Sequence, residues 1–230
     1  MVYITGDTHG YIERFSPEQM PGESEWTEDD YLIICGDFGF VYRDDEEENS
    51  SLDALSEKPY TICFCDGNHE NFTVLSEYRE VDWHGGRVHK IRKNIFHLMR
   101  GNVYDIDGEK FFAMGGAYSI DRATRIEGFS WWRDELPSEK EYKYAAANLE
   151  KHNKKVDYVI THTAPREIIR KMGEYPDMHD AALTGFLEWV MYEVEFKKWF
   201  FGHWHIDRKI DDKFRALLFD VVTTDIKMLT

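Results

Sequence analysis

The 230-residue chain is poor in basic residues, with 28 Lys and Arg against 44 Asp and Glu, which gives a formal net charge of −16. A surface of this sign repels polyanions, so a long nucleic acid is not expected as a partner. The excess of acidic residues is unevenly distributed along the chain. Residues 1–50 hold 14 acids and 2 bases, a net of −12, whereas residues 51–230 hold 30 acids and 26 bases, a net of −4.

The chain also lacks long apolar runs, linkers and paired cysteines. No segment reaches the ~18 consecutive apolar residues of a membrane helix, and the first residues become polar too early for a signal peptide. No Pro/Gly/Ser-rich tract divides the chain, so we expect one domain over residues 1–230 and no membrane association. The cysteines are odd in number and lie in apolar runs, which favours reduced core thiols in a cytoplasmic protein; they are Cys35, Cys63 and Cys65.

Short apolar runs recur along the chain and predict strands that are buried on both faces. They are Val2–Thr5, Tyr31–Cys35, Tyr60–Cys65, Phe111–Met114, Val156–Thr161 and Lys198–Phe201. A capping-box sequence begins a helical pattern at Ser138, and residues 180–195 form a second helical stripe. Weaker helical patterns and short C-terminal strands complete the prediction: Glu46–Ser56, Asn71–Arg79, then Arg208–Ile210, Phe214–Phe219 and Val221–Thr223. This alternation predicts an α/β sandwich.

Polar clusters follow five of these strands, four of them introduced by glycine. They are Gly6-Asp7-Thr8-His9, Gly36-Asp37, Gly67-Asn68-His69-Glu70, His162 and Gly202-His203-Trp204-His205. Ligands of open α/β sheets bind just outside the carboxyl ends of strands, and glycine lets the backbone approach closely. Each cluster alone has an ordinary explanation as a turn, a helix start or an exposed histidine pair. Five in succession, all with nitrogen or oxygen ligands, indicate a common site.

The set offers seven metal ligands, more than one tetrahedral site uses. They are the carboxylates of Asp7 and Asp37, the amide of Asn68 and the imidazoles of His9, His162, His203 and His205. Two ions ~3.5–4 Å apart that share a carboxylate would use them all. Mixed nitrogen and oxygen ligation favours Mn, Fe, Zn, Co or Ni over Mg, with Mn as the first choice. Two divalent ions carry four positive charges, and two carboxylates with one hydroxide carry three negative charges. The remaining positive charge suits a phosphoester.

With these motifs in this order over residues 7–205, the sequence resembles the calcineurin-like, binuclear metallophosphoesterases. The resemblance implies an αββα sandwich of two mixed β-sheets flanked by helices. It implies that a metal-bridging hydroxide attacks the phosphoester while His69 assists the leaving group. It also implies two ligand sets that share Asp37: Asp7, His9, Asp37 and His205 for one ion, and Asp37, Asn68, His162 and His203 for the other.

One motif departs from the Gly-Asp-x-x-Asp-Arg-Gly of the Ser/Thr protein phosphatases in this family. Phe40 stands in place of the second aspartate and Val41 in place of the arginine. A partner that would orient His69 and a phosphate-binding arginine are therefore missing. We expect a small phosphomonoester or phosphodiester as the substrate rather than a phosphoprotein.

Two arginines after the glycine pair at residues 115 and 116 are candidate substrate contacts, Arg122 and Arg125. Surface ion pairs with Asp121 and Glu127 are the alternative explanation for both. Residues 83–100 hold five bases and no acid, which we interpret as an edge strand protected by charge. The acidic run Asp44–Glu48 is interpreted as a solvated loop or helix start.

Two other functions stay open. A nuclease acting on short single strands would use the basic stretch at residues 83–100. A non-catalytic interaction module could retain the metallophosphoesterase fold, but such a protein is expected to lose ligands, and here no ligand of the motifs is missing.

Overall fold

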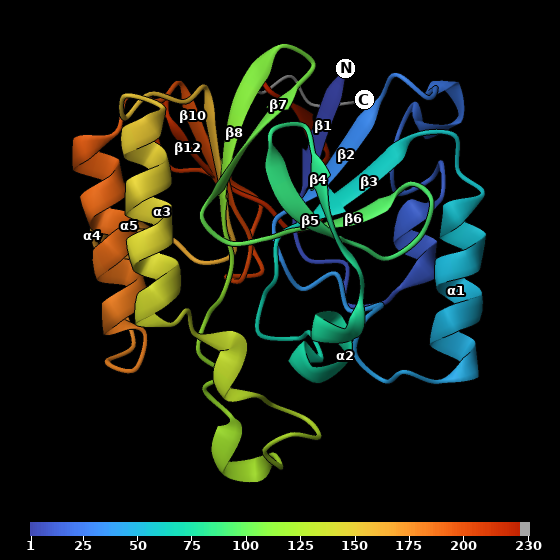
Figure 1. The fold of residues 1–230 in the computed structure, drawn as a ribbon, viewed down its shortest axis with the longest axis horizontal. Coiled ribbons are helices and arrows are strands. Elements are labelled where there is room, and N and C mark those ends of the chain that lie inside the picture. The colour runs from blue at the N-terminus through green and yellow to red at the C-terminus, as the bar shows by residue number, and fades with distance from the viewer. Residues whose placement is uncertain (226–230) are drawn as a thin grey trace.

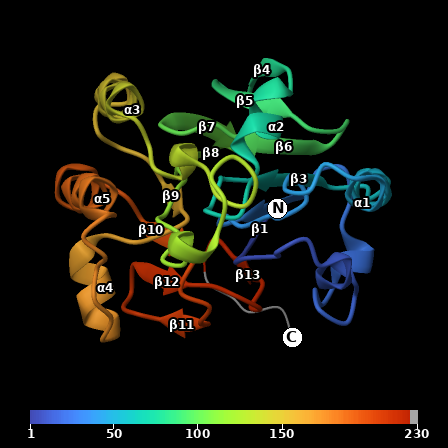
Figure 2. The same cartoon turned by 90° about the horizontal axis from the view of Figure 1, so that it is seen from below.

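Two mixed β-sheets pack face to face, and helices cover their outer faces (Figures 1 and 2). The structure is a computed structural model that describes residues 1–225. One sheet has the order β13 (Val222–Thr223), β1 (Val2–Thr5), β2 (Tyr31–Ile34), β3 (Thr61–Phe64), β6 (Ile95–Leu98), β5 (Gly86–Lys90) and β4 (Glu80–Trp83). The other has the order β11 (Arg208–Lys209), β12 (Phe214–Ala216), β10 (Lys198–Phe201), β9 (Tyr158–Thr161), β8 (Glu109–Met114) and β7 (Asn102–Ile106). The predicted fold class is confirmed.

The central strands are apolar on both faces because each face packs against a different layer. Ile4 and Ile33 point into the core between the sheets, where Phe111 and Ile160 meet them from the second sheet. Their neighbour Leu32 points outward. There the first sheet is covered by α1 (Glu46–Ser56), α2 (Phe72–Glu77) and the short 3-10 helix Ile12–Phe15. The second sheet is covered by α3 (Glu139–Lys151), α4 (Arg166–Met172) and α5 (Ala181–Glu193) (Figure 2).

Helices α1 and α3 begin at capping residues that the sequence carries. Ser138 and Glu141 form the predicted capping box of α3, in which the serine hydroxyl accepts the Glu141 N–H at 3.3 Å. Asp45 caps α1 in the same way. The acidic run is thus a helix start, as predicted. It is not simply solvated, because the buried Glu48 carboxylate accepts the backbone N–H groups of residues 42–44.

All three cysteines are free and buried, as predicted. None of the helices within residues 1–225 has the length and hydropathy to span a bilayer. Strands β4 and β7 and helix α4 were not predicted, because the strands carry scattered polar residues and the helix has only seven residues.

The prediction of a charged edge strand over residues 83–100 was wrong. The edge strand is β4, and β5 and β6 lie inside the sheet. Four of its five bases pair with acids outside the segment: Arg87 with Glu80, Arg92 with Asp53, Lys93 with Glu57 and Arg100 with Asp66. These bases therefore fasten the sheet to its surroundings, and they do not line the site described below.

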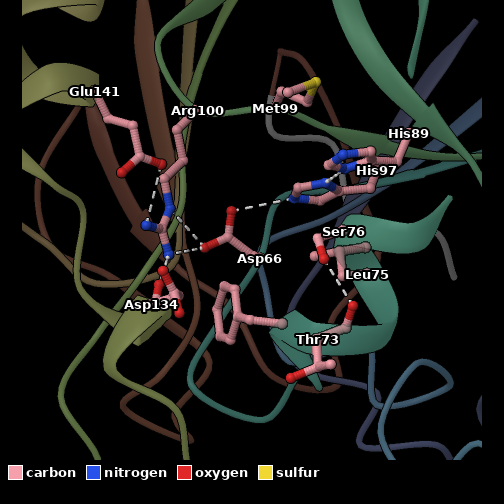
Figure 3. Close-up of a pocket in the computed structure, with 11 residues that line it drawn as sticks. Asp66, Thr73, Leu75, Ser76, His89, His97, Met99, Arg100, Asp134 and Glu141 are labelled. Carbon is pink, nitrogen blue, oxygen red and sulfur yellow. Dashed lines mark hydrogen bonds and ion pairs between the residues drawn. The ribbon is translucent and has the colours of Figure 1, made fainter. Parts of the chain in front are cut away.

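Arg100 is the buried member of this set (Figure 3). Its Nε donates to Asp66 Oδ2 at 2.8 Å, and its Nη2 donates to the same oxygen and to the Asp134 carbonyl at 2.6 Å. His97 Nε2 contacts the other Asp66 oxygen at 3.1 Å. Burial alone would raise the pKa of Asp66, but Arg100 and His97 lower it to about 2. The network joins the loop after β3 to the loop that precedes α3.

Replacement of Arg100 by Met should destabilise the fold by about 3–5 kcal/mol, because it leaves the Asp66 charge buried without its main partner. The matched control Arg87→Met removes an exposed ion pair and should cost about 1 kcal/mol or less. Urea unfolding of both variants measures the difference. Equal losses would show that the buried pair contributes no more than a surface one.

Candidate metal centre

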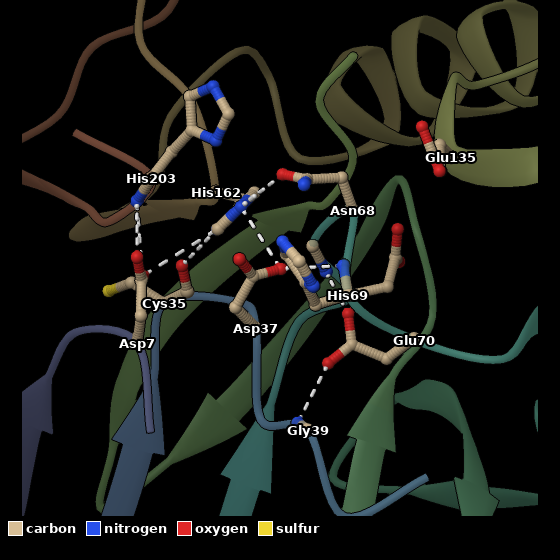
Figure 4. Close-up of polar contacts among 12 residues, drawn as sticks. Asp7, Cys35, Asp37, Gly39, Asn68, His69, Glu70, Glu135, His162 and His203 are labelled. Carbon is tan, nitrogen blue, oxygen red and sulfur yellow. Dashed lines mark hydrogen bonds and ion pairs between the residues drawn. The ribbon is translucent and has the colours of Figure 1, made fainter. Parts of the chain in front are cut away.

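Glycines allow the five loops to converge. A Cβ on Gly202 would lie 2.0 Å from Asp7 Oδ1, and a Cβ on Gly67 would lie 2.0 Å from Asp37 Oδ1. Each carboxylate therefore occupies space that a side chain on another loop would fill. The other two motif glycines are equally confined, Gly6 against Leu217 and Gly36 against His162. The predicted close approach of backbone to a site is confirmed, and the strands point toward it (Figure 4).

Four of the predicted ligands form one tight group. The ligand atoms of Asp7, His9, Asp37 and His205 all lie within 4.8 Å of one another. The Nε2 atoms of His9 and His205 are 3.0 Å apart, and His205 Nε2 is 3.2 Å from Asp7 Oδ2. Three of these residues have left-handed backbones, with φ of 48° at His9 and Asp37 and 51° at His205. Such conformations are costly for non-glycine residues and concentrate at functional sites.

The three other predicted ligands, Asn68, His162 and His203, lie beside this group (Figure 4). His162 Nδ1 donates to the Cys35 carbonyl at 2.9 Å, which leaves Nε2 as the acceptor. That atom faces Asn68 Oδ1 at 3.1 Å and Asp37 Oδ1 at 3.3 Å. Ser119 Oγ accepts from the Asn68 amide nitrogen at 3.2 Å, so the amide oxygen is turned toward the site.

This arrangement requires a cation. The neutral imidazole, the amide oxygen and the carboxylate are all acceptors, so they repel one another unless a proton or a metal ion lies among them. Without a metal ion a proton takes this place, because the Asp37 carboxylate raises the pKa of His162 to about 10 although burial opposes it. The chemistry of the donor set therefore fits a metal ion at this position.

Asp37 lies between the two groups. Its Oδ2 is 3.9 Å from His9 Nε2, and its Oδ1 is 3.3 Å from His162 Nε2. Burial would raise the pKa of Asp37, but His162, His69 and His9 hold it far below the usual range. The backbone N–H of His69 donates to Oδ1 at 2.8 Å. One carboxylate thus presents an oxygen to each group, as a shared ligand must.

The remaining histidines take different positions. The ring of His203 lies 4.9 Å from that of His162, and burial lowers the pKa of His203 to about 3. His203 is therefore neutral, as a metal ligand must be. The ring of His69 lies 5.2 Å from that of His9, and burial lowers its pKa as well.

The two candidate arginines differ in their contacts. Arg125 Nη2 is 3.3 Å from His69 Nε2, and its Nε donates to Asp121 at 2.8 Å. Arg122 instead donates to the buried Glu135 carboxylate at 2.9 Å and stacks on Tyr118. Arg125 lines the cavity of about 570 Å³ above the site, whereas Arg122 does not. The structure brings only Arg125 to the ligands.

A family model described as calcineurin-like phosphoesterase matches residues 1–207. The chain belongs to this family. No curated protein matches the chain. At the place where the family's protein phosphatases carry an aspartate and an arginine, this member has Phe40 and Val41, both buried in the core. The position that would orient the histidine is thus apolar in this chain.

Two supporting residues were missed or given no role by sequence reasoning. Glu70 joins two loops, because its carboxylate accepts the N–H of Gly67 at 2.5 Å and of Gly39 at 3.3 Å. Burial and the nearby Asp37 raise the pKa of Glu70 to about 8. Ser119, which orients Asn68, follows the glycine pair after β8. The glycine pair could have indicated Ser119. It was instead interpreted as pointing to the two arginines that follow, Arg122 and Arg125.

Replacement of Gly202 by Ala should lower metal affinity at least about tenfold, because the new Cβ displaces Asp7 from its position. The matched control is Gly185→Ala in α5, where a Cβ meets nothing closer than 3.5 Å. That control should bind metal normally and gain up to about 1 kcal/mol of stability. Isothermal titration with Mn²⁺ compares the two. Unchanged affinity in the Gly202 variant would contradict the proposed packing of the site.

Proposed function

We propose that the protein is a metal-dependent phosphoesterase acting on a small phosphomonoester or phosphodiester. The observation that carries this proposal is the convergence of acceptor atoms from five loops around Asp37, an arrangement that only cations stabilise. The family membership supports hydrolysis of a phosphoester as the reaction.

We propose two ions that share Asp37, with Mn as the first choice among Mn, Fe, Zn, Co and Ni. Asp7, His9 and His205 would complete one ligand set, and Asn68, His162 and His203 the other. Bound in this way, the ions would supply a nucleophile at neutral pH and offset charge on the phosphoryl oxygens. The protein holds the ligands in place beforehand through glycine contacts and through hydrogen bonds to Cys35 and Ser119.

His69 is the proposed proton donor to the leaving oxygen. Its backbone is fixed by Asp37, and its Nε2 faces Arg125 in the cavity. A substrate phosphate would attract the Arg125 guanidinium and free Nε2 to hold a proton near the leaving oxygen. Arg125 would thus bind the phosphate and take over part of the role of the missing arginine. Arg122, the other predicted contact, would act through Glu135 and Tyr118 rather than on the substrate.

We place the protein in the cytoplasm, where its three buried thiols would stay reduced. Burial raises the pKa of each thiol, which suits packing rather than reaction. Because the surface charge is negative, the proposed partner is a small phosphoester and not a long nucleic acid.

The direct test is turnover by protein loaded with Mn²⁺. p-Nitrophenyl phosphate, bis-p-nitrophenyl phosphate, cyclic nucleotides and single-stranded DNA form the substrate panel. We expect hydrolysis of at least one of the small esters and none without metal. Hydrolysis of the DNA alone would instead identify a nuclease. No turnover of any compound, with two ions bound, would contradict the proposal and favour the interaction module.

His69→Ala should keep both metal ions and lower kcat by a factor of about 10²–10⁴, the usual contribution of a general acid. Asp37→Ala should leave the centre empty, because both ligand sets lose a member. His152→Ala, which removes the C-cap residue of α3, serves as the matched control and should change neither property. Metal analysis and steady-state kinetics separate these outcomes. Loss of metal from the His69 variant would make His69 a ligand, and two ions in the Asp37 variant would exclude the bridging role.

A further inference from the structure

The site opens on two sides. A cavity of about 570 Å³ lies on the side of Asn68 and His203, and another of about 440 Å³ lies on the side of His9. Both are lined by His69 and His205, so the two cavities meet at the proposed proton donor and at a proposed metal ligand. We name them the first arm and the second arm.

Aromatic and apolar side chains form the walls of both arms. In the first arm these residues are Tyr118, Ile120, Tyr175 and Trp204. Tyr11 and Tyr42 line the second arm, which adjoins a cavity of about 410 Å³ lined by the same two tyrosines. Tyr175 is 90% exposed and Tyr11 is 64% exposed. Each arm thus offers a ring surface that a flat substrate group could cover.

Two of the wall residues, Tyr118 and Tyr42, are held in place by neighbouring groups. Tyr118 stacks on His179 at 4.4 Å, and the Arg122 guanidinium lies 4.2 Å from the same ring. Asp180 accepts the Tyr118 N–H at 2.7 Å. On the other side, the Tyr42 hydroxyl donates to the Ser130 carbonyl at 3.0 Å. These two rings are therefore positioned before a ligand enters, which lowers the entropy cost of binding.

Negative charge limits how many phosphates the arms accept. Besides the proposed metal ligand Asp37, the first arm is lined by one arginine, Arg125, against four acids: Asp121, Glu174, Asp177 and Asp180. The cavity adjoining the second arm has one arginine, Arg43, against Glu13, Glu47 and Glu48. Phosphate groups beyond the one at the metal centre would meet these carboxylates at close range, so the arms suit uncharged groups.

Donors for phosphate oxygens are also few. Among the described residues that line the two arms, Arg125 is the only arginine. Val41 occupies the place where the protein phosphatases carry another arginine. A monoester dianion has three terminal oxygens to satisfy, whereas a diester monoanion has two. The donor supply therefore fits the diester better.

We propose that the substrate is a phosphodiester with one phosphate whose two alcohol groups both carry a ring, one in each arm. This inference rests on the proposed phosphoesterase function and chooses the diester within it. Water adds its oxygen to phosphorus, and the P–O bond to one alcohol breaks. A water proton ends on the departing oxygen, so the products are an alcohol and a phosphomonoester.

Substrates of different size test the arms. Bis-p-nitrophenyl phosphate has two rings, methyl p-nitrophenyl phosphate has one, and both release the same phenol. We expect kcat/KM to be higher for bis-p-nitrophenyl phosphate than for methyl p-nitrophenyl phosphate. It should also be higher than for the monoester p-nitrophenyl phosphate. Tyr11→Ala and Tyr175→Ala should each raise KM for the two-ring diester about two- to tenfold, the range of an aromatic contact. With methyl p-nitrophenyl phosphate, which has one ring, one of the two substitutions should raise KM less than it does with the two-ring diester.

Tyr192→Ala is the matched control, because this tyrosine is 67% exposed on α5 and lies outside both arms. Calorimetric binding of diphenyl phosphate, which lacks a good leaving group, measures the arms without turnover and should weaken in both arm variants. Equal kcat/KM for the two diesters, a preference for the monoester, or unchanged binding in the arm variants would overturn the inference alone. No hydrolysis of any ester by protein with two bound ions would overturn the proposed function with it.

Discussion

Two carboxylates buried where the sheets meet are the constraint on which the site depends. The side chains of Asp7 and Asp37 are almost fully shielded from water, and their ion-pair partners within residues 1–225 are histidines. Two negative charges in such a place need nearby cations. Metal ions would supply them. The same physical effect then explains the glycines, the left-handed backbones and the hydrogen bonds to the ligands. All of them hold acceptor groups together against their mutual repulsion.

The sequence predicted that these side chains would converge, because parallel strands end at the same edge of a sheet. Each polar cluster followed a short apolar run, so the topology alone was enough to bring Asp7, Asp37 and Asn68 together. His162 and His203 come from strands of the other sheet in the same way. The sharing of Asp37 followed from family resemblance rather than from the pattern. The distances to His9 and His162 now support it.

Features that depend on partners distant in sequence could not be predicted. The bases of residues 83–100 resembled an edge strand, but their acids lie elsewhere, as the pair of Arg100 with Asp66 shows. The same limit applied to Ser119 and to Arg122, whose contacts arise only once the loop after β8 is folded (Figure 1). The uneven charge also gains meaning from the structure. Acids of the first fifty residues, Glu13 among them, line the cavity next to the second arm.

Five loops that build a centre for two metal ions around one shared carboxylate should bind both ions in the unmodified protein. Equilibrium dialysis of the unmodified protein against Mn²⁺, followed by elemental analysis, tests it most directly. We expect saturation at two ions per chain. Saturation at one ion, or no binding at millimolar Mn²⁺, would contradict it.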